Sequence, residues 1–82
     1  MNRPELEAEV KRSSSLPFQR IIRGDDVDGY LAEAPELPGC ITAGANPMEA
    51  NVMLQDAIEG WIGAALKAGE KVPEPAAIRV SG

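Results

Sequence analysis

The sequence contains no histidine and a single cysteine, Cys40. Without histidine the chain lacks the commonest metal ligand and general base of proteins. One thiol cannot build an intramolecular disulfide framework, so a reducing cytoplasm is the compartment that fits best. No nucleophile with a base, metal-binding set or phosphate loop stands out. We therefore predict a protein that is not an enzyme and uses no metal or cofactor.

Basic residues are also few, with 8 Lys and Arg against 13 Asp and Glu, a net charge of -5. Phosphate neutralisation needs clustered Lys and Arg, so autonomous nucleic-acid binding is not expected. A basic protein partner suits this balance better. The chain has no apolar run near the roughly 20 residues of a membrane span and no export-signal pattern at its start, so we expect neither export nor membrane insertion.

Aromatic residues make up only 4% of the chain. Tyr30 and Trp61 are therefore expected in the core rather than in a ligand pocket. With 82 residues, the domain would bury only about 60% of its unfolded surface. Because small domains without disulfides or metals often gain stability by assembly, we expect self-association into a dimer or tetramer. A sheet edge or the outer face of a long helix is the expected contact.

The N-terminal residues 3–12 are predicted to form a short helix. Leu6 and Val10 lie four residues apart and share one face, which suggests a helix that lies on a larger element. The serine run at 13–15 reads as a linker. We accordingly divide the chain into a helix and linker at 1–15 and a main domain at 16–82.

Residues 18–24, 30–34 and 40–43 are predicted to form strands, the first two as a hairpin. The turn at 25–29 has several aspartates, and Gly29 can take a positive φ there. Arg20 and Arg23 are expected on the outer sheet face. The short run at residues 77–80 could form a fourth strand.

Residues 47–68 have the clearest helix start in the chain. Asn46 is a good N-cap, Pro47 suits the first helical position, and Glu49 can reach back to the N–H of the cap. Gly69 is a natural C-terminal cap. Gly60 and Gly63 lie inside this helix, so close backbone packing is expected to compensate for them. The predicted sheet-covering stripe is Ala50, Met53, Leu54, Ala57, Ile58, Trp61 and Ala65.

The predicted fold is therefore α+β, with a three-stranded antiparallel sheet covered by one long helix and a short helix before it. This series of elements and motifs resembles the HicB-like antitoxin family, whose core is a partial ribonuclease H fold. The resemblance covers residues 18 to about 75. It is carried by Asp26-Val27-Asp28-Gly29-Tyr30, Pro35-Glu36-Leu37-Pro38-Gly39-Cys40, Thr42, Gly44, Glu49-Ala50, Ala57-Ile58 and Pro73.

The resemblance implies an antitoxin of a type II toxin-antitoxin system. Proteins of this family hold a small basic HicA-type ribonuclease inactive by covering its active face. Many also carry a C-terminal DNA-binding module, but only seven residues follow Pro75 here, so such a module is not expected. A ribonuclease H core does not imply nuclease activity, because that chemistry needs several carboxylates converging on metal ions, and this sequence lacks that set.

The candidate partner-binding residues are Asp25, Asp26, Asp28 and Glu33. One interpretation is an acidic patch that meets a basic toxin. The other is a solvated turn, because turns favour Asp for local backbone bonding. Cys40 starts an apolar strand and is expected to be a buried small hydrophobe rather than a reactive thiol.

Two functions from different classes follow. The first is an antitoxin-like protein that masks a basic ribonuclease. The second is a stand-alone oligomeric structural or interaction module that retains the fold without a toxin partner. A weaker third possibility, a divergent metal-dependent hydrolase, predicts RNA cleavage by the chain alone.

Overall fold

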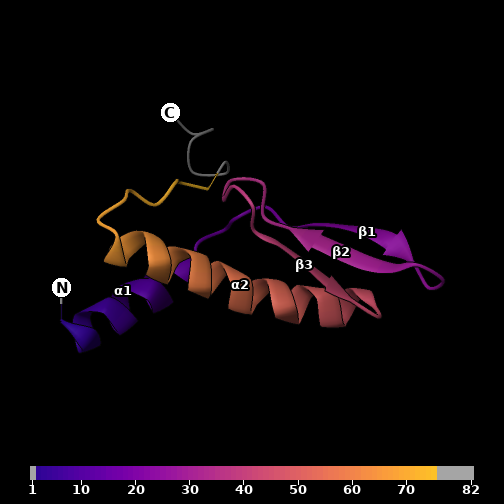
Figure 1. The fold of residues 1–82 in the computed structure, drawn as a ribbon, viewed down its shortest axis with the longest axis horizontal. Coiled ribbons are helices and arrows are strands. Elements are labelled where there is room, and N and C mark those ends of the chain that lie inside the picture. The colour runs from indigo at the N-terminus through magenta and orange to yellow at the C-terminus, as the bar shows by residue number, and fades with distance from the viewer. Residues whose placement is uncertain (1, 76–82) are drawn as a thin grey trace.

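The computed structural model describes residues 2–75 and confirms the predicted α+β class. Its elements are helix α1 (Arg3–Ser14), strands β1 (Ile21–Asp25), β2 (Gly29–Glu33) and β3 (Ile41–Gly44), and helix α2 (Pro47–Lys67). The strands form an antiparallel sheet in the order β1-β2-β3, and α2 lies across one of its faces (Figure 1). The fourth strand predicted at 77–80 lies outside the described residues.

The two ends of α2 follow the predicted capping. The side-chain oxygen of Asn46 accepts a hydrogen bond from the Glu49 N–H at 2.8 Å, and Pro47 is the first helical residue. The Glu49 carboxylate bonds the N–H of Ala45 at 3.2 Å rather than the N–H of the cap itself. Helix α2 ends at Lys67, one residue earlier than predicted, with Ala68 as its C-cap, and Gly69 follows with a φ of 75°. These contacts satisfy backbone groups that a helix terminus would otherwise leave unpaired.

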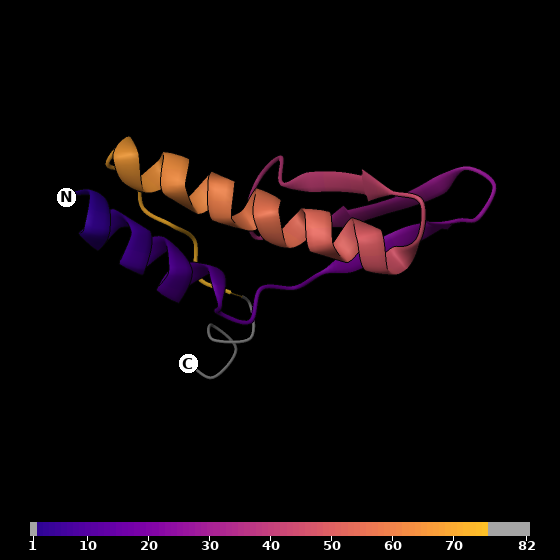
Figure 2. The same cartoon turned by 90° about the horizontal axis from the view of Figure 1, so that it is seen from below.

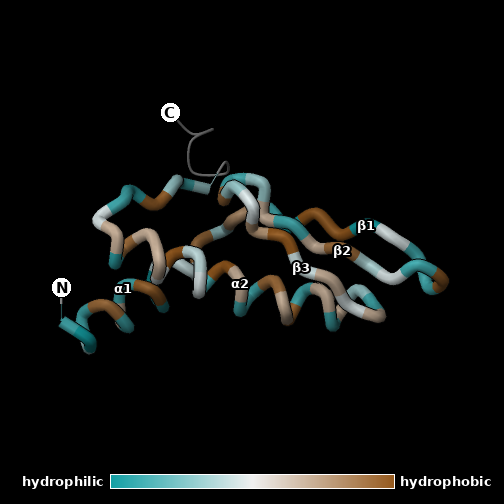
Figure 3. Tube along the Cα trace, in the orientation of Figure 1, coloured by the Kyte–Doolittle hydropathy of each residue, from teal (hydrophilic) through white to brown (hydrophobic). Residues whose placement is uncertain are grey.

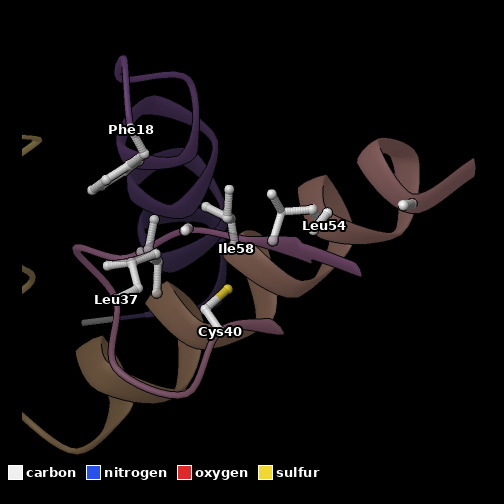
Figure 4. Packing of buried hydrophobic residues seen from close by; sticks show 9 residues of the cluster. Phe18, Leu37, Cys40, Leu54 and Ile58 are labelled. Atoms are coloured by element: carbon white, nitrogen blue, oxygen red, sulfur yellow. The ribbon is translucent and has the colours of Figure 1, made fainter. Parts of the chain in front are cut away.

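The hydrophobic core lies between α2, the inner face of the sheet and the loop that joins β2 to β3. Its buried members are Phe18, Ala32, Ala34, Leu37, Cys40, Ala50, Leu54, Ile58 and Ile62. Leu37, Cys40 and Ile58 lie close together at its centre (Figure 4). Cys40 is buried as predicted, and burial raises the pKa of its thiol above the ordinary value, which favours the protonated form.

One residue of the predicted stripe on α2 is wrongly placed, and one core residue is missing from it. Met53 is 48% exposed, whereas Ile62 is fully buried. The apolar surface of α2 is wider than the strip that contacts the sheet, and successive helix residues are about 100° apart. Met53 falls on the flank turned away from the core. Periodicity alone could not decide which flank the sheet would cover.

Two hydrogen bonds attach α2 to strand β3 and to the loop between β2 and β3. The hydroxyl of Thr42 donates to the carbonyl of Ala50 at 3.0 Å, and the indole N–H of Trp61 donates to the carbonyl of Pro38 at 2.9 Å. Trp61 is half-buried and packs against the core, as expected. A buried indole usually finds an acceptor in this way. The loop between β2 and β3 is therefore held to the middle of α2.

The two arginines of the first strand region lie on opposite faces of the sheet. The guanidinium of Arg20 donates to the side chains of Asn51 and Gln55 on α2. Only Arg23 therefore lies on the outer face, where both had been expected. Alternation in an extended chain would place residues 20 and 23 on opposite faces, because their separation is odd.

The first strand begins at Ile21, three residues later than predicted. The N–H of Phe18 donates to Leu16, and the N–H of Gln19 donates to the carboxylate of Glu36 at 2.9 Å. These two N–H groups therefore bond residues in loops, whereas the N–H groups of a strand would bond a neighbouring strand. Phe18 instead enters the core.

Helix α1 runs antiparallel to the C-terminal half of α2 and beyond the sheet (Figure 2). This confirms that it lies on a larger element. It extends through Ser13 and Ser14, which are buried, so the predicted linker is wrong there. The hydroxyl of Ser14 donates to the carbonyl of Lys11 at 3.3 Å, a local bond that lets serine end a helix.

The two glycines inside α2 differ in their surroundings. A Cβ on Gly63 would lie 3.6 Å from a methyl group of Val10 in α1, an ordinary contact, whereas a Cβ on Gly60 would meet nothing within 4 Å. Close packing therefore does not explain Gly60. None of the helices in the described part of the chain is long and apolar enough to cross a membrane.

Candidate partner-binding site

The turn between β1 and β2 is organised by its first aspartate. One carboxylate oxygen of Asp25 accepts hydrogen bonds from the N–H groups of Val27 at 2.9 Å and Asp28 at 2.7 Å. Gly29 closes the turn with a φ of 87°, a conformation that glycine adopts without strain. The local interpretation therefore accounts for Asp25, whose side chain is committed to the turn.

The second aspartate of the turn contacts the first aromatic residue of β2. The phenol of Tyr30 donates to a carboxylate oxygen of Asp26 at 2.7 Å. This hydrogen bond, with a smaller effect of desolvation, raises the pKa of Tyr30 above its ordinary value, because loss of the proton would break the bond and place two negative charges together. Asp26 therefore fixes the side chain of Tyr30 over the hairpin.

Replacing Asp26 by asparagine is expected to lower the pKa of Tyr30 toward its ordinary value. Because the folded pKa exceeds the unfolded value of about 10, the bond adds stability below pH ~10, and this contribution is lost as pH rises through the folded pKa. The sequence has one tyrosine, so ultraviolet absorbance follows its titration directly. Asp28→Asn is the matched control. An equal shift in both variants would contradict a specific bond.

The tip of the hairpin presents an acidic side chain beside an apolar one. The side chain of Asp28 makes no hydrogen bond or ion pair within residues 2–75, and Val27 is 92% exposed. Carboxylates around an exposed aliphatic group are suited to a basic protein surface with a small apolar depression. Nothing in the sequence pattern distinguished Val27, since exposure at a turn depends on how far the hairpin extends beyond the helix.

Glu33 does not join the aspartates of the turn. It lies at the other end of β2, four residues from Gly29, which corresponds to about 13 Å along a strand. Its carboxylate is 3.4 Å from the guanidinium of Arg23 on the outer face of the sheet. The predicted set of four residues therefore comprises a cluster of three at the turn and a separate, paired glutamate.

The structure adds Glu49 to the surroundings of the turn. An open hollow at this end of the sheet is lined by Arg23, Asp28 and Glu49, together with glycine backbone. Asp28 and Glu49 are far apart in sequence, and the close approach of β3 to the first turn of α2 brings them to one hollow. The sequence explained Glu49 by capping alone, which is correct but incomplete.

The described part of the chain holds no cluster of side chains suited to metal binding. Within residues 2–75, no three side chains of the types Asp, Glu, Cys and His gather closely enough to hold a metal ion. The three turn aspartates are exposed, and the carboxylates of Asp25 and Asp26 accept hydrogen bonds from their own hairpin.

Known proteins resemble this chain in sequence. Residues 18–81 match the family model described as HicB_like antitoxin of bacterial toxin-antitoxin system. The UPF0150 protein Ta0767 of Thermoplasma acidophilum is 34% identical over 58 residues, which cover 71% of this chain and 84% of that protein. No solved structure gave a significant match. The chain therefore belongs to the HicB-like antitoxin family.

Proposed function

We propose that this protein is the antitoxin of a type II pair and neutralises a small basic HicA-type ribonuclease by covering its active face. The observation that carries the proposal is the family match over residues 18–81, which supports an antitoxin role with a toxin partner. The net charge of -5 further supports a basic partner. Opposite net charges speed association and disfavour acidic competitors.

The proposed toxin contact is the hairpin tip, formed by Asp25, Asp26 and Asp28 around Val27. Glu33, the fourth predicted residue, lies apart from this contact, because its carboxylate faces the guanidinium of Arg23 on the outer side of the sheet. Of the three turn carboxylates, only Asp28 is uncommitted to a hydrogen bond within the described residues. It is therefore the side chain most available to a lysine or arginine of a toxin.

We further propose that the protein self-associates, acts in the cytoplasm and does not bind nucleic acid by itself. A buried, unpaired thiol at Cys40 is compatible with a reducing compartment. The excess of carboxylates opposes contact with phosphates. On this proposal, the protein acts by keeping RNA out of the active site of its partner enzyme.

The test is inhibition of the small basic protein encoded beside this gene. RNA cleavage by that purified protein is expected to stop when this chain is added in equimolar amount. Cleavage that continues unchanged with the chain in excess, or the absence of any such neighbouring gene, would overturn the proposal and favour a stand-alone interaction module. The chain assayed alone with divalent metal ions serves as the control for nuclease activity of its own.

The acidic tip makes a separate prediction about association rate. Asp28→Lys is expected to slow association with the basic partner by about tenfold at low salt, because a repulsive charge replaces an attractive one. Stopped-flow measurements across a salt series would record this, with the difference shrinking as salt increases. Glu70→Lys makes the same charge change at the far end of α2. Equal slowing by both variants would refute a localised contact.

A further inference from the structure

The face of the sheet turned away from α2 is unusually apolar. Ile21, Leu31 and Ile41 point to this side and are 44%, 43% and 47% exposed, with Ala43 exposed beside them. A sheet with one solvated face normally alternates polar residues outward. Strands β1 and β2 instead show hydrophobic segments that run side by side (Figure 3). A second layer is therefore missing from this face of the described chain.

The strand register makes these side chains one continuous patch. Ile21, Glu33 and Ile41 form one row across the three strands, and Arg23, Leu31 and Ala43 form the next. Leu31 on the central strand therefore lies diagonally between the two isoleucines, within reach of both. The hollow described above, which Asp28 and Glu49 line, also includes Leu31 and Ala43, so it borders this patch at the hairpin end of the sheet. We call the six residues of the two rows the outer sheet face.

The charge pattern of the outer sheet face favours a second copy over a basic toxin. Of these six residues, Arg23 and Glu33 are charged, opposite in sign and 3.4 Å apart, so the patch carries no net charge on a chain of net charge -5, and the aspartates of the turn lie beyond its hairpin end. A basic protein gains little from a neutral surface, while two acidic copies repel least here. A twofold axis could also bring Arg23 of one copy to Glu33 of the other.

We propose that the outer sheet face packs against the same face of a second copy, forming a twofold dimer with Leu31 at its centre. This inference rests on the proposed self-association and is independent of the identity of the toxin. Three strands of four or five residues cover about 17 by 14 Å, which is small beside a standard interface of about 800 Å² per partner. The dimer is therefore reversible and dependent on concentration.

The experiment is sedimentation of the full chain over a concentration series. Leu31→Lys is expected to raise the dimer dissociation constant at least tenfold, and the folded state tolerates it because Leu31 is already 43% exposed. Val52→Lys is the matched control, since Val52 is 56% exposed on α2 and the charge change is identical. It should leave the dimer intact. Circular dichroism confirms that both variants are folded.

A charge exchange provides a second, independent measurement. Arg23→Glu should weaken the dimer, and adding Glu33→Arg should restore it. A wild-type monomer at every concentration would overturn both the self-association and the surface assignment. A dimer that survives Leu31→Lys, or that Val52→Lys dissociates instead, would overturn the surface alone. Loss of toxin inhibition by Leu31→Lys with the dimer retained would assign the face to the toxin and refute the proposal.

Discussion

Replacing Gly44 by alanine is expected to destabilise the protein by about 3 kcal/mol, the upper end of the usual cost of overpacking. A Cβ at this position would lie 2.5 Å from the backbone nitrogen and 2.9 Å from the Cα of Ala50. Both are backbone atoms in the first turn of α2, so no flexible side chain can move aside. Strand β3 and α2 would have to separate, which would also lengthen the bond from Thr42 to Ala50.

Gly60→Ala is the control because the chemical change is identical. The position is helical and a Cβ there meets no atom within 4 Å. Alanine is expected to stabilise the protein by up to about 1 kcal/mol through helix propensity. Urea unfolding followed by the fluorescence of the single tryptophan measures both changes at one protein concentration. Equal unfolding midpoints for the two variants would show that α2 adjusts to the added methyl group.

Ile58→Ala is expected to cost about 3 to 4 kcal/mol, since the residue is fully buried between α2 and the sheet. The loss includes the transfer free energy of the removed groups and the cavity that remains. A domain of this size has a total stability of about 4 to 12 kcal/mol. The variant is therefore expected to be partly unfolded at physiological temperature, with a thermal midpoint lowered by more than about 10 °C.

Val52→Ala on the same helix provides the comparison. Val52 is 56% exposed, and surface changes of this kind usually stay within about 0.5 kcal/mol. Thermal unfolding monitored by circular dichroism separates the two cases. If Val52→Ala proved as costly as Ile58→Ala, the side of α2 that faces the sheet would have to be reassigned.

The ends of α2 could be predicted because the signals there are local. Asn46 bonds an N–H three residues away, and Gly69 needs only its own backbone freedom. The hairpin turn is local in the same sense, because Asp25 bonds the next residues along the chain. Interactions between neighbours in sequence were therefore visible before the fold was known.

The errors arose where a contact between distant segments decides the outcome. The burial of Ile62 and the exposure of Met53 depend on which flank of α2 meets the sheet. Ser13 and Ser14 join α1 although serine is common in linkers, and both are buried. At the candidate site, Asp28 and Glu49 line one hollow because α2 packs on the sheet, and no sequence spacing encodes that packing.

Among the helices and strands of the described chain, α1 contacts only α2. Detaching α1 would therefore break no strand pairing and would leave the contacts of α2 with the sheet in place. Such a segment can open at lower free energy than global unfolding. We therefore expect α1 to unfold separately from the unit formed by α2 and the sheet. Amide protons of α1 should exchange with solvent well before those of the three strands.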